Sequence, residues 1–144
     1  MADPDKRYEI LPHPADGKFR AFGRTLEEAF ANAALATASF MWDWSRIAPR
    51  LAFPVKVMGR DREQLLVKFL GEVIYLLETK AFLLGGVDGL EIVETSGGLA
   101  LEAVFRGEAL SSDHELGGDV KAVTYNEMII EEGDGVTVQV VVDM

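Results

Sequence analysis

The stretch DREQLLVKFLGEVIYLL, from Asp61 to Leu77, decides the fold more clearly than any other part of the chain. It opens on a capping box, in which the side chains of Asp61 and Gln64 can each accept from a free backbone N–H at the start of a helix. The apolar residues behind it recur at helical spacing and share one face: Leu65, Leu66, Phe69, Leu70, Val73, Ile74 and Leu77. The stretch therefore predicts a long amphipathic helix with one buried face.

The segments on both sides of this helix alternate apolar and polar residues, which is the pattern of half-buried strands. Expected strands span residues 8–11, 18–22, 53–58, 82–84, 89–94, 99–105, 120–130 and 136–142. Gly97-Gly98 and the glycines of 133–135 predict hairpin turns, because glycine adopts the positive φ that such turns require.

A second capping box, Thr25 to Glu28, opens an alanine-rich segment that predicts another helix, from Leu26 to about Met41. No repeat, low-complexity tract or linker interrupts the chain, so we expect a single domain over residues 1–144. Two helices on one side of a mostly antiparallel or mixed sheet system give a two-layer α+β fold.

The composition of the chain excludes several classes of function. The chain has 144 residues, no cysteine and a net charge of -10, so thiol chemistry and cysteine zinc sites are excluded. The polar N-terminus and the lack of a long apolar run predict a cytoplasmic protein with no membrane contact. An acidic surface disfavours direct nucleic-acid binding and suits a divalent cation or a basic partner, although the same charge also serves solubility.

Two places along the chain offer oxygen ligands. His13-Pro14-Ala15-Asp16 forms a tight connection between two expected strands, and the chain ends on Asp143 and the carboxylate of Met144. Side-chain and main-chain oxygens are the ligands that a hard cation prefers. Each place also has a simpler interpretation, which is favoured when that place is taken alone: Asp16 can close an Asx-type turn, and a chain terminus is usually solvated.

Motifs for independent catalysis are missing. The sequence contains no P-loop, no glycine-rich dinucleotide fingerprint and no nucleophile elbow. Paired carboxylates could hold an ion that activates water, but no general base or nucleophile accompanies them. We therefore expect an accessory protein rather than a hydrolase.

Taken together and in this order, the segments resemble the archease family along nearly the whole chain. The resemblance rests on residues 8–16, 20–30, 59–61 and 120–125, and on an aspartate close to the C-terminus. Three residues depart from the family pattern: Pro14, Gly17 and Asn126 stand where threonine, an aliphatic residue and histidine are usual.

The resemblance implies an archease fold and a site for a divalent metal made by Asp16, Asp143 and Met144, with Ca²⁺ as the first candidate and Mg²⁺ or Mn²⁺ as alternatives. It also implies a partner, the GTP-dependent tRNA-splicing RNA ligase, whose guanylylation and multiple turnover the protein would promote. An alternative role is that of a chaperone or specificity factor for a tRNA cytosine methyltransferase. Candidates for supporting the metal pocket or facing the partner are His13, Asp43, Glu108, Lys121 and Tyr125.

Overall fold

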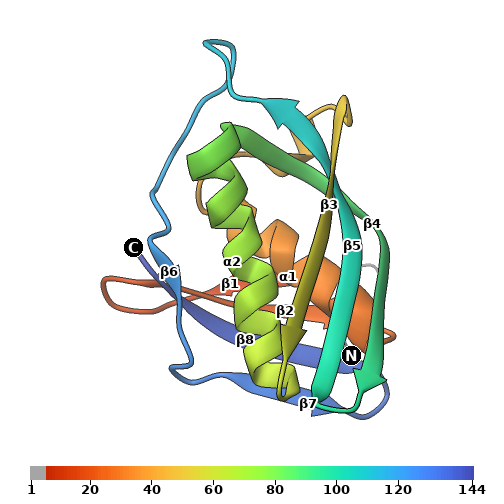
Figure 1. The fold of residues 1–144 in the computed structure, drawn as a ribbon. Coiled ribbons are helices and arrows are strands. Elements are labelled where there is room, and N and C mark those ends of the chain that lie inside the picture. Colours follow the sequence, from red (N-terminus) through yellow and green to blue (C-terminus); the bar gives the residue numbers. More distant parts are fainter. Residues whose placement is uncertain (1–5) are drawn as a thin grey trace.

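The computed structural model describes residues 6–144 and shows two α-helices, one short 3-10 helix and eight strands in that range (Figure 1). All strand pairs are antiparallel and form two separate sheets, so the expected α+β class is confirmed. The first five residues of the domain expected over 1–144, and with them most of the polar N-terminus, lie outside the described residues. No helix in the described part of the chain is long and apolar enough to cross a membrane.

The five-stranded sheet joins the beginning of the chain to its end. Its strands are β1 (Tyr8–Leu11), β2 (Gly17–Gly23), β8 (Val136–Asp143), β6 (Ala122–Val123) and β7 (Ile129–Glu132). β2 pairs along its full length with β8, while β6 and β7 pair with different parts of the other edge of β8. The last strand of the chain is therefore central in this sheet, and its alternate valines, which share one face, belong to the buried core: Val136, Val138, Val140 and Val142.

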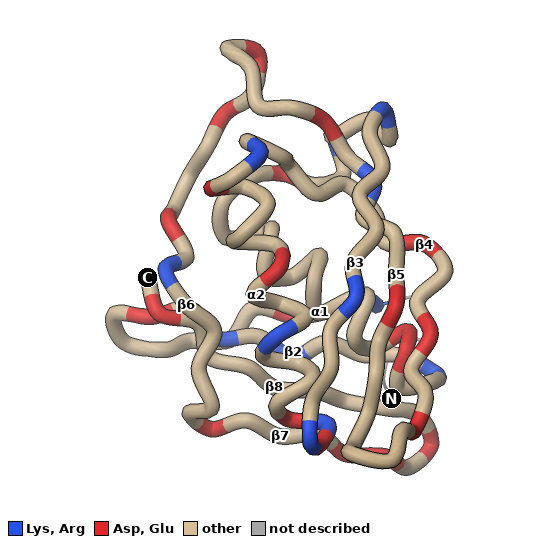
Figure 2. Tube along the Cα trace, in the orientation of Figure 1, with Lys and Arg blue, Asp and Glu red and all other residues tan. Residues whose placement is uncertain are grey.

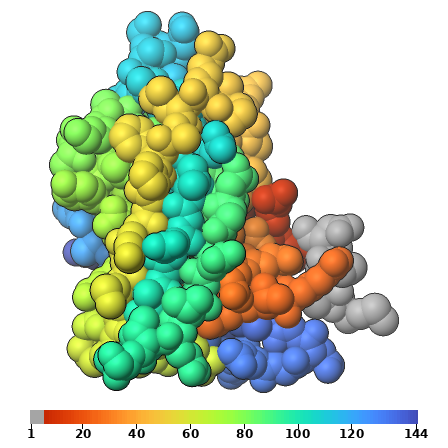
Figure 3. All heavy atoms as spheres, turned by 45° about the vertical axis from the view of Figure 1, so that its right-hand side comes forward, coloured from red at the N-terminus to blue at the C-terminus, as the bar shows by residue number. Residues whose placement is uncertain are grey.

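The three-stranded sheet has the order β3-β5-β4, with β3 at Leu51–Gly59, β5 at Gly98–Ala109 and β4 at Phe82–Thr95. The segments expected as separate strands at 82–84 and 89–94 are one strand, β4, because β5 offers a partner along its whole length. Two register shifts, between Leu84 and Gly86 and between Asp88 and Glu91, bend β4 without ending the pairing. Figure 3 shows the outer face of this sheet at the surface of the molecule.

Both helices begin where the capping boxes predict. The Thr25 hydroxyl accepts from the Glu28 amide at the start of α1 (Leu26–Ser39), and Asp61 accepts from the Gln64 amide at the start of α2 (Arg62–Lys80). The returning bond goes to the residue before the cap in each case, Arg24 and Arg60, rather than to the cap itself. α1 ends two residues earlier than expected.

The strand expected over 120–130 is wrong. Only Ala122–Val123 and Ile129–Glu132 are strands, and a turn separates them. Thr124 turns its hydroxyl as well as its amide to the Val141 carbonyl, and Glu127 adopts a positive φ of 53°. A side chain that competes for a ladder carbonyl, followed by a left-handed residue, interrupts a strand that apolar alternation alone would continue.

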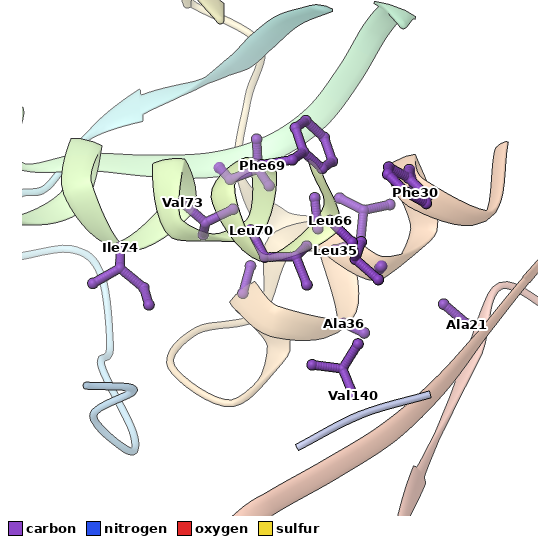
Figure 4. Close-up of a cluster of buried hydrophobic side chains, with 14 of the residues drawn as sticks. Ala21, Phe30, Leu35, Ala36, Leu66, Phe69, Leu70, Val73, Ile74 and Val140 are labelled. Carbon is purple, nitrogen blue, oxygen red and sulfur yellow. The ribbon is translucent and has the colours of Figure 1, made fainter. Parts of the chain in front are cut away.

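The helices form the core against both sheets. α1 contacts β2 and β8 of one sheet and β4 of the other, while α2 contacts β3, β4 and β5. Figure 4 shows the two helices meeting around Phe30, Leu66 and Phe69. The Phe69 ring lies 6.3 Å from that of Phe30 and 5.5 Å from that of Phe105 on β5, measured between centroids. The helices thus hold the two sheets in a fixed relation, which positions the end of β8.

Candidate functional site

The two expected metal ligands lie at the same end of the five-stranded sheet. Gly17 of β2 pairs with Val142 of β8. The residues immediately beyond this pair are Asp16, which precedes β2, and Asp143, which is the last residue of β8. Figure 2 shows acidic positions both in the loop between β1 and β2 and beside the C-terminus.

The loop that carries Asp16 reverses direction within a few residues. Ala15 takes a positive φ of 65°, so the chain turns sharply just before Asp16 and the start of β2. The Asp16 carboxylate remains about one-third exposed, and its Oδ2 lies 4.0 Å from Nδ1 of His13. The loop therefore presents a carboxylate and an imidazole side by side.

On its other side, Asp143 is held by the chain around β6. Ala122 pairs with Asp143, and the Lys121 amide donates to the Asp143 carbonyl at 2.8 Å. That bond occupies the carbonyl and leaves the Asp143 carboxylate exposed. Met144 packs partly buried against the core, with its terminal methyl close to Gly118.

Glu127 is a residue of this region that the sequence analysis missed. Its carboxylate bonds Nε2 of His13 at 2.9 Å and accepts from Nζ of Lys18 at 3.2 Å. The hydrogen bond from His13, followed by that from Lys18, lowers the pKa of the Glu127 carboxyl below its usual value. His13 and Glu127 are 114 residues apart, and no spacing in the sequence relates them.

The ligand chemistry suits a hard divalent cation. The Asp16 and Asp143 side chains carry carboxylate oxygens, and the main-chain oxygen of Met144 follows Asp143 directly. Within residues 6–144, no three or more histidine, cysteine or acidic side chains are gathered closely enough to form a preassembled metal cluster. A cation here would accordingly retain water or draw on main-chain oxygens as well.

Asp43 and Glu108 belong to a different place. Both line a surface cleft of about 980 Å³ that neither Asp16 nor Asp143 lines. Asp43 caps the 3-10 helix η1 (Trp44–Arg46) by accepting from the amide and hydroxyl of Ser45, and the hydroxyl bond is the main cause of its lowered pKa.

Glu108 holds the long loop after β5. It bonds Nε2 of His114 at 2.8 Å and accepts from Nε of Arg50 at 3.0 Å. The Ser111 amide donates to the other nitrogen of His114, so the imidazole is engaged on both sides. The hydrogen bond from His114, ahead of that from Arg50, lowers the pKa of the Glu108 carboxyl.

The Glu108 network predicts an acid-sensitive contribution to stability. A carboxyl whose pKa is lowered by folding stabilises the native state above its ordinary value of 4.5, and that contribution is lost as pH falls through the lowered pKa. We expect Glu108→Gln to unfold at lower urea concentration than the wild type at about pH 6, with the difference shrinking towards about pH 3. Urea titrations at several pH values measure this difference. A difference that stays constant over the range would contradict the prediction.

Lys121 and Tyr125 lie in the segment that follows the loop after β5, and both are exposed. Tyr125 is 52% exposed, so its ring is open to solvent. Because the Lys121 backbone bonds Asp143, these two side chains stand near the end of the five-stranded sheet and are available to a partner.

Gly17, one of the three departures from the family pattern, is buried at the start of β2. A Cβ at this position would lie 2.8 Å from the Phe40 ring, and 2.9 Å from a methyl of Val142. The glycine therefore lets Phe40 pack directly on the strand beside Asp16. The other two departures, Pro14 and Asn126, are exposed.

Comparison with known proteins gives a consistent result. Residues 8–144 match the sequence model described as the Archease protein family (MTH1598/TM1083). The chain is 39% identical to "Protein archease" of Methanosarcina acetivorans, with all of both chains covered. It is 37% identical to "Protein archease" of Pyrobaculum neutrophilum, with 95% of each covered.

A solved structure shares the fold. The solution structure of Methanobacterium thermoautotrophicum protein 1598 superposes with a TM-score of 0.80 at 30% sequence identity, over 96% of this chain and 99% of that chain. The fold described above is therefore shared with an experimentally determined relative.

Proposed function

The chain belongs to the archease family, and on that premise we propose that it is a metal-dependent accessory protein that activates the GTP-dependent tRNA-splicing RNA ligase. The observation that carries the proposal is the strand register: Gly17 lies opposite Val142, Asp16 is the loop residue just before β2, and Asp143 is the last residue of β8. A ligand pair that unites the start and the end of the chain is what the family resemblance leads us to expect.

The carboxylates of Asp16 and Asp143 would hold the ion, together with the terminal carboxylate or main chain of Met144. When bound, a divalent cation supplies positive charge that relieves the repulsion between neighbouring carboxylates and offers open coordination positions. The protein's own residues would bind the ion and orient the two carboxylates. β2 and β8 fix the spacing of the two aspartates, and the Lys121 amide holds the Asp143 backbone.

The partner would dock over the same end of the sheet. Lys121 and Tyr125 are exposed there, and an exposed tyrosine can anchor an interface by its apolar area. A protein with a net charge of -10 also complements a ligase surface that is basic because it binds RNA. In this arrangement the accessory protein performs no covalent step, and it favours the guanylylated state of the ligase by binding that state more tightly.

The test is a ligation assay with the cognate ligase at limiting concentration, GTP, and RNA ends that the ligase joins. We expect substoichiometric amounts of this protein to convert a single round of ligation into many rounds, with faster guanylylation of the ligase. Equal turnover with and without the protein would reject the proposal. If the protein instead kept a tRNA cytosine methyltransferase from aggregating, without GTP or metal, the chaperone role would replace it.

A further inference from the structure

The strand β4 forms an open edge of the three-stranded sheet. It pairs with β5 on one side, and within residues 6–144 no strand lies on its other side. From Glu91 to Thr95 its pairing with β5 is regular, so the backbone there is extended. An edge strand carries backbone N–H and C=O groups that can pair with another chain.

A groove of about 530 Å³ follows this edge. Three successive residues of β4 line it: Ile92, Val93 and Glu94. Successive side chains of a strand point to opposite faces, so a groove that touches all three runs along the edge of the strand. Leu26 of α1 and Leu99 of β5 add apolar lining, and Val93 is 55% exposed. The groove therefore offers apolar area beside unpaired backbone.

Three carboxylates around the groove have no cation beside them. Glu27 lies in the first turn of α1, Glu63 in the first turn of α2, and Glu94 on β4. None of the three forms an ion pair in the described part of the chain. The helix dipole favours an acid in a first turn, which accounts for two of them without a ligand but not for Glu94.

The other charged residues of the groove already have partners. Arg62 donates to Glu132 at 2.7 Å. Asp61 caps α2 and lies 3.5 Å from Nε of Arg60. A molecule that entered the groove would therefore meet negative charge that nothing in the protein balances.

The arrangement of these charges selects one class of occupant. Over residues 6–144 no three acidic side chains gather closely enough to hold a metal ion, so the carboxylates suit cations that are spaced along a chain. Negative charge repels RNA and anionic lipid. It also repels a second copy of this protein, whose net charge is -10. A protein segment with lysine or arginine side chains fits the groove better than any of these.

We propose that the β4 edge and its groove bind an extended basic segment of a partner protein, which adds a strand beside β4. Main-chain hydrogen bonds to the edge supply affinity, and alternate side chains supply specificity. Side chains on one face of the added strand would meet the carboxylates of Glu27, Glu63 and Glu94, while those on the other face would cover Val93. A segment that alternates basic and apolar residues satisfies both requirements.

This surface is separate from the proposed metal site. Glu132 of the groove pairs with Val136, the first residue of β8, whereas Asp143 is the last residue of that strand. Those two ends are about 23 Å apart along the strand. In Figure 1 the hairpin of β4 and β5 gathers with the start of α2 and with β7 at the lower end of the molecule. The inference therefore goes beyond the proposed function and can fail or hold independently of it.

The experiment titrates a short synthetic peptide that alternates lysine and valine into the isotope-labelled full chain, and follows the backbone amides by NMR. A peptide of the same composition, with its lysines and valines in two blocks, is the control probe. One triple variant removes the unpaired carboxylates: Glu27→Gln, Glu63→Gln and Glu94→Gln. The matched triple variant removes the same charge from exposed positions outside the groove: Glu78→Gln, Asp113→Asn and Glu115→Gln. Thermal melting verifies that each variant is folded.

We expect the alternating peptide to shift the amides from Glu91 to Thr95 most, and to bind more tightly than the block peptide. The groove triple variant should bind it about tenfold more weakly, because three ion pairs are lost, whereas the matched triple variant should change affinity less than about twofold. Val93→Thr keeps the branched shape but adds a hydroxyl, and it should weaken binding about threefold. Asp143→Asn should bind the peptide as the wild type does.

Several results would overturn the proposal. Equal losses in the two triple variants, or shifts spread over the acidic surface, would show attraction to net charge alone. Wild-type affinity in Val93→Thr would remove the strand edge from the binding site. A dimer detected by sedimentation in the wild type and absent in Val93→Thr would assign the groove to a second copy of the chain. Weaker binding in Asp143→Asn would show that the two ends of β8 are not independent.

Discussion

Asp143→Asn is expected to abolish the stabilisation of this protein by Ca²⁺ and, with it, the activation of the ligase. An ion that binds only the native state stabilises it by about 2.7 kcal/mol at a hundredfold excess over Kd, equivalent to roughly 8 °C in Tm for a domain of this size. Asparagine keeps the shape of the side chain and removes the charge that the cation needs. Thermal melting with and without Ca²⁺ measures the first effect, and the ligation assay measures the second.

The control for this variant lies just before the same strand. Asp134 precedes β8 in the turn after β7, at the end opposite Asp143, and Asp134→Asn changes the net charge by the same amount. This control should keep the full Ca²⁺ shift and full ligase activation. Without added ion, Asp143→Asn should melt no lower than the wild type, because the substitution also removes a like-charge neighbour of Asp16. A Ca²⁺ shift of wild-type size in Asp143→Asn would exclude the aspartate pair as the metal site.

Phe69→Ala is expected to destabilise the fold by about 3–5 kcal/mol, a large part of the total stability of a small domain. Phe69 is fully buried on α2 and touches the rings of Phe30 on α1 and Phe105 on β5. Its removal leaves a cavity where both helices and the three-stranded sheet meet. Urea unfolding, analysed by linear extrapolation, measures the loss.

A control variant on the same helix distinguishes the loss of core packing from a change in helix propensity. Tyr75 of α2 is 56% exposed, and Tyr75→Ala should change the free energy of unfolding by no more than about 0.5 kcal/mol. Equal losses for the two variants would show that Phe69 does not join the layers as described. A loss at Phe69 alone, accompanied by weaker Ca²⁺ binding, would show that the core also maintains the proposed metal site.

The helices were predictable because their signals are local. The capping boxes at Thr25 and Asp61 set the first residue of each helix, and the apolar spacing from Leu65 to Leu77 identified the buried face. The long strand over 120–130 was wrongly predicted because the alternation of apolar and polar residues does not show which hydrogen bonds a side chain will make. The second bond from Thr124 to the Val141 carbonyl depends on β8, which lies later in the chain.

The candidate site also combines residues that the sequence predicted with residues that only the structure revealed. Asp16 and Asp143 were expected from residue type and family resemblance, and the register of β2 with β8 brings both to the same end of the sheet. Glu127 and its bond to His13 carried no sequence signal, because an exposed turn residue far along the chain resembles any solvated acid. Asp43 and Glu108 were grouped with the metal loop by charge alone, whereas they line another cleft.

The sequence by itself determined the secondary-structure class, the helix starts and the family, because these depend on neighbours along the chain. The tertiary structure decided that β8 lies between β2 and the segment of β6 and β7, and so which side chains meet at its end. Strand order and register are set by burial of apolar faces across the whole fold, and no local pattern encodes the contact between His13 and Glu127.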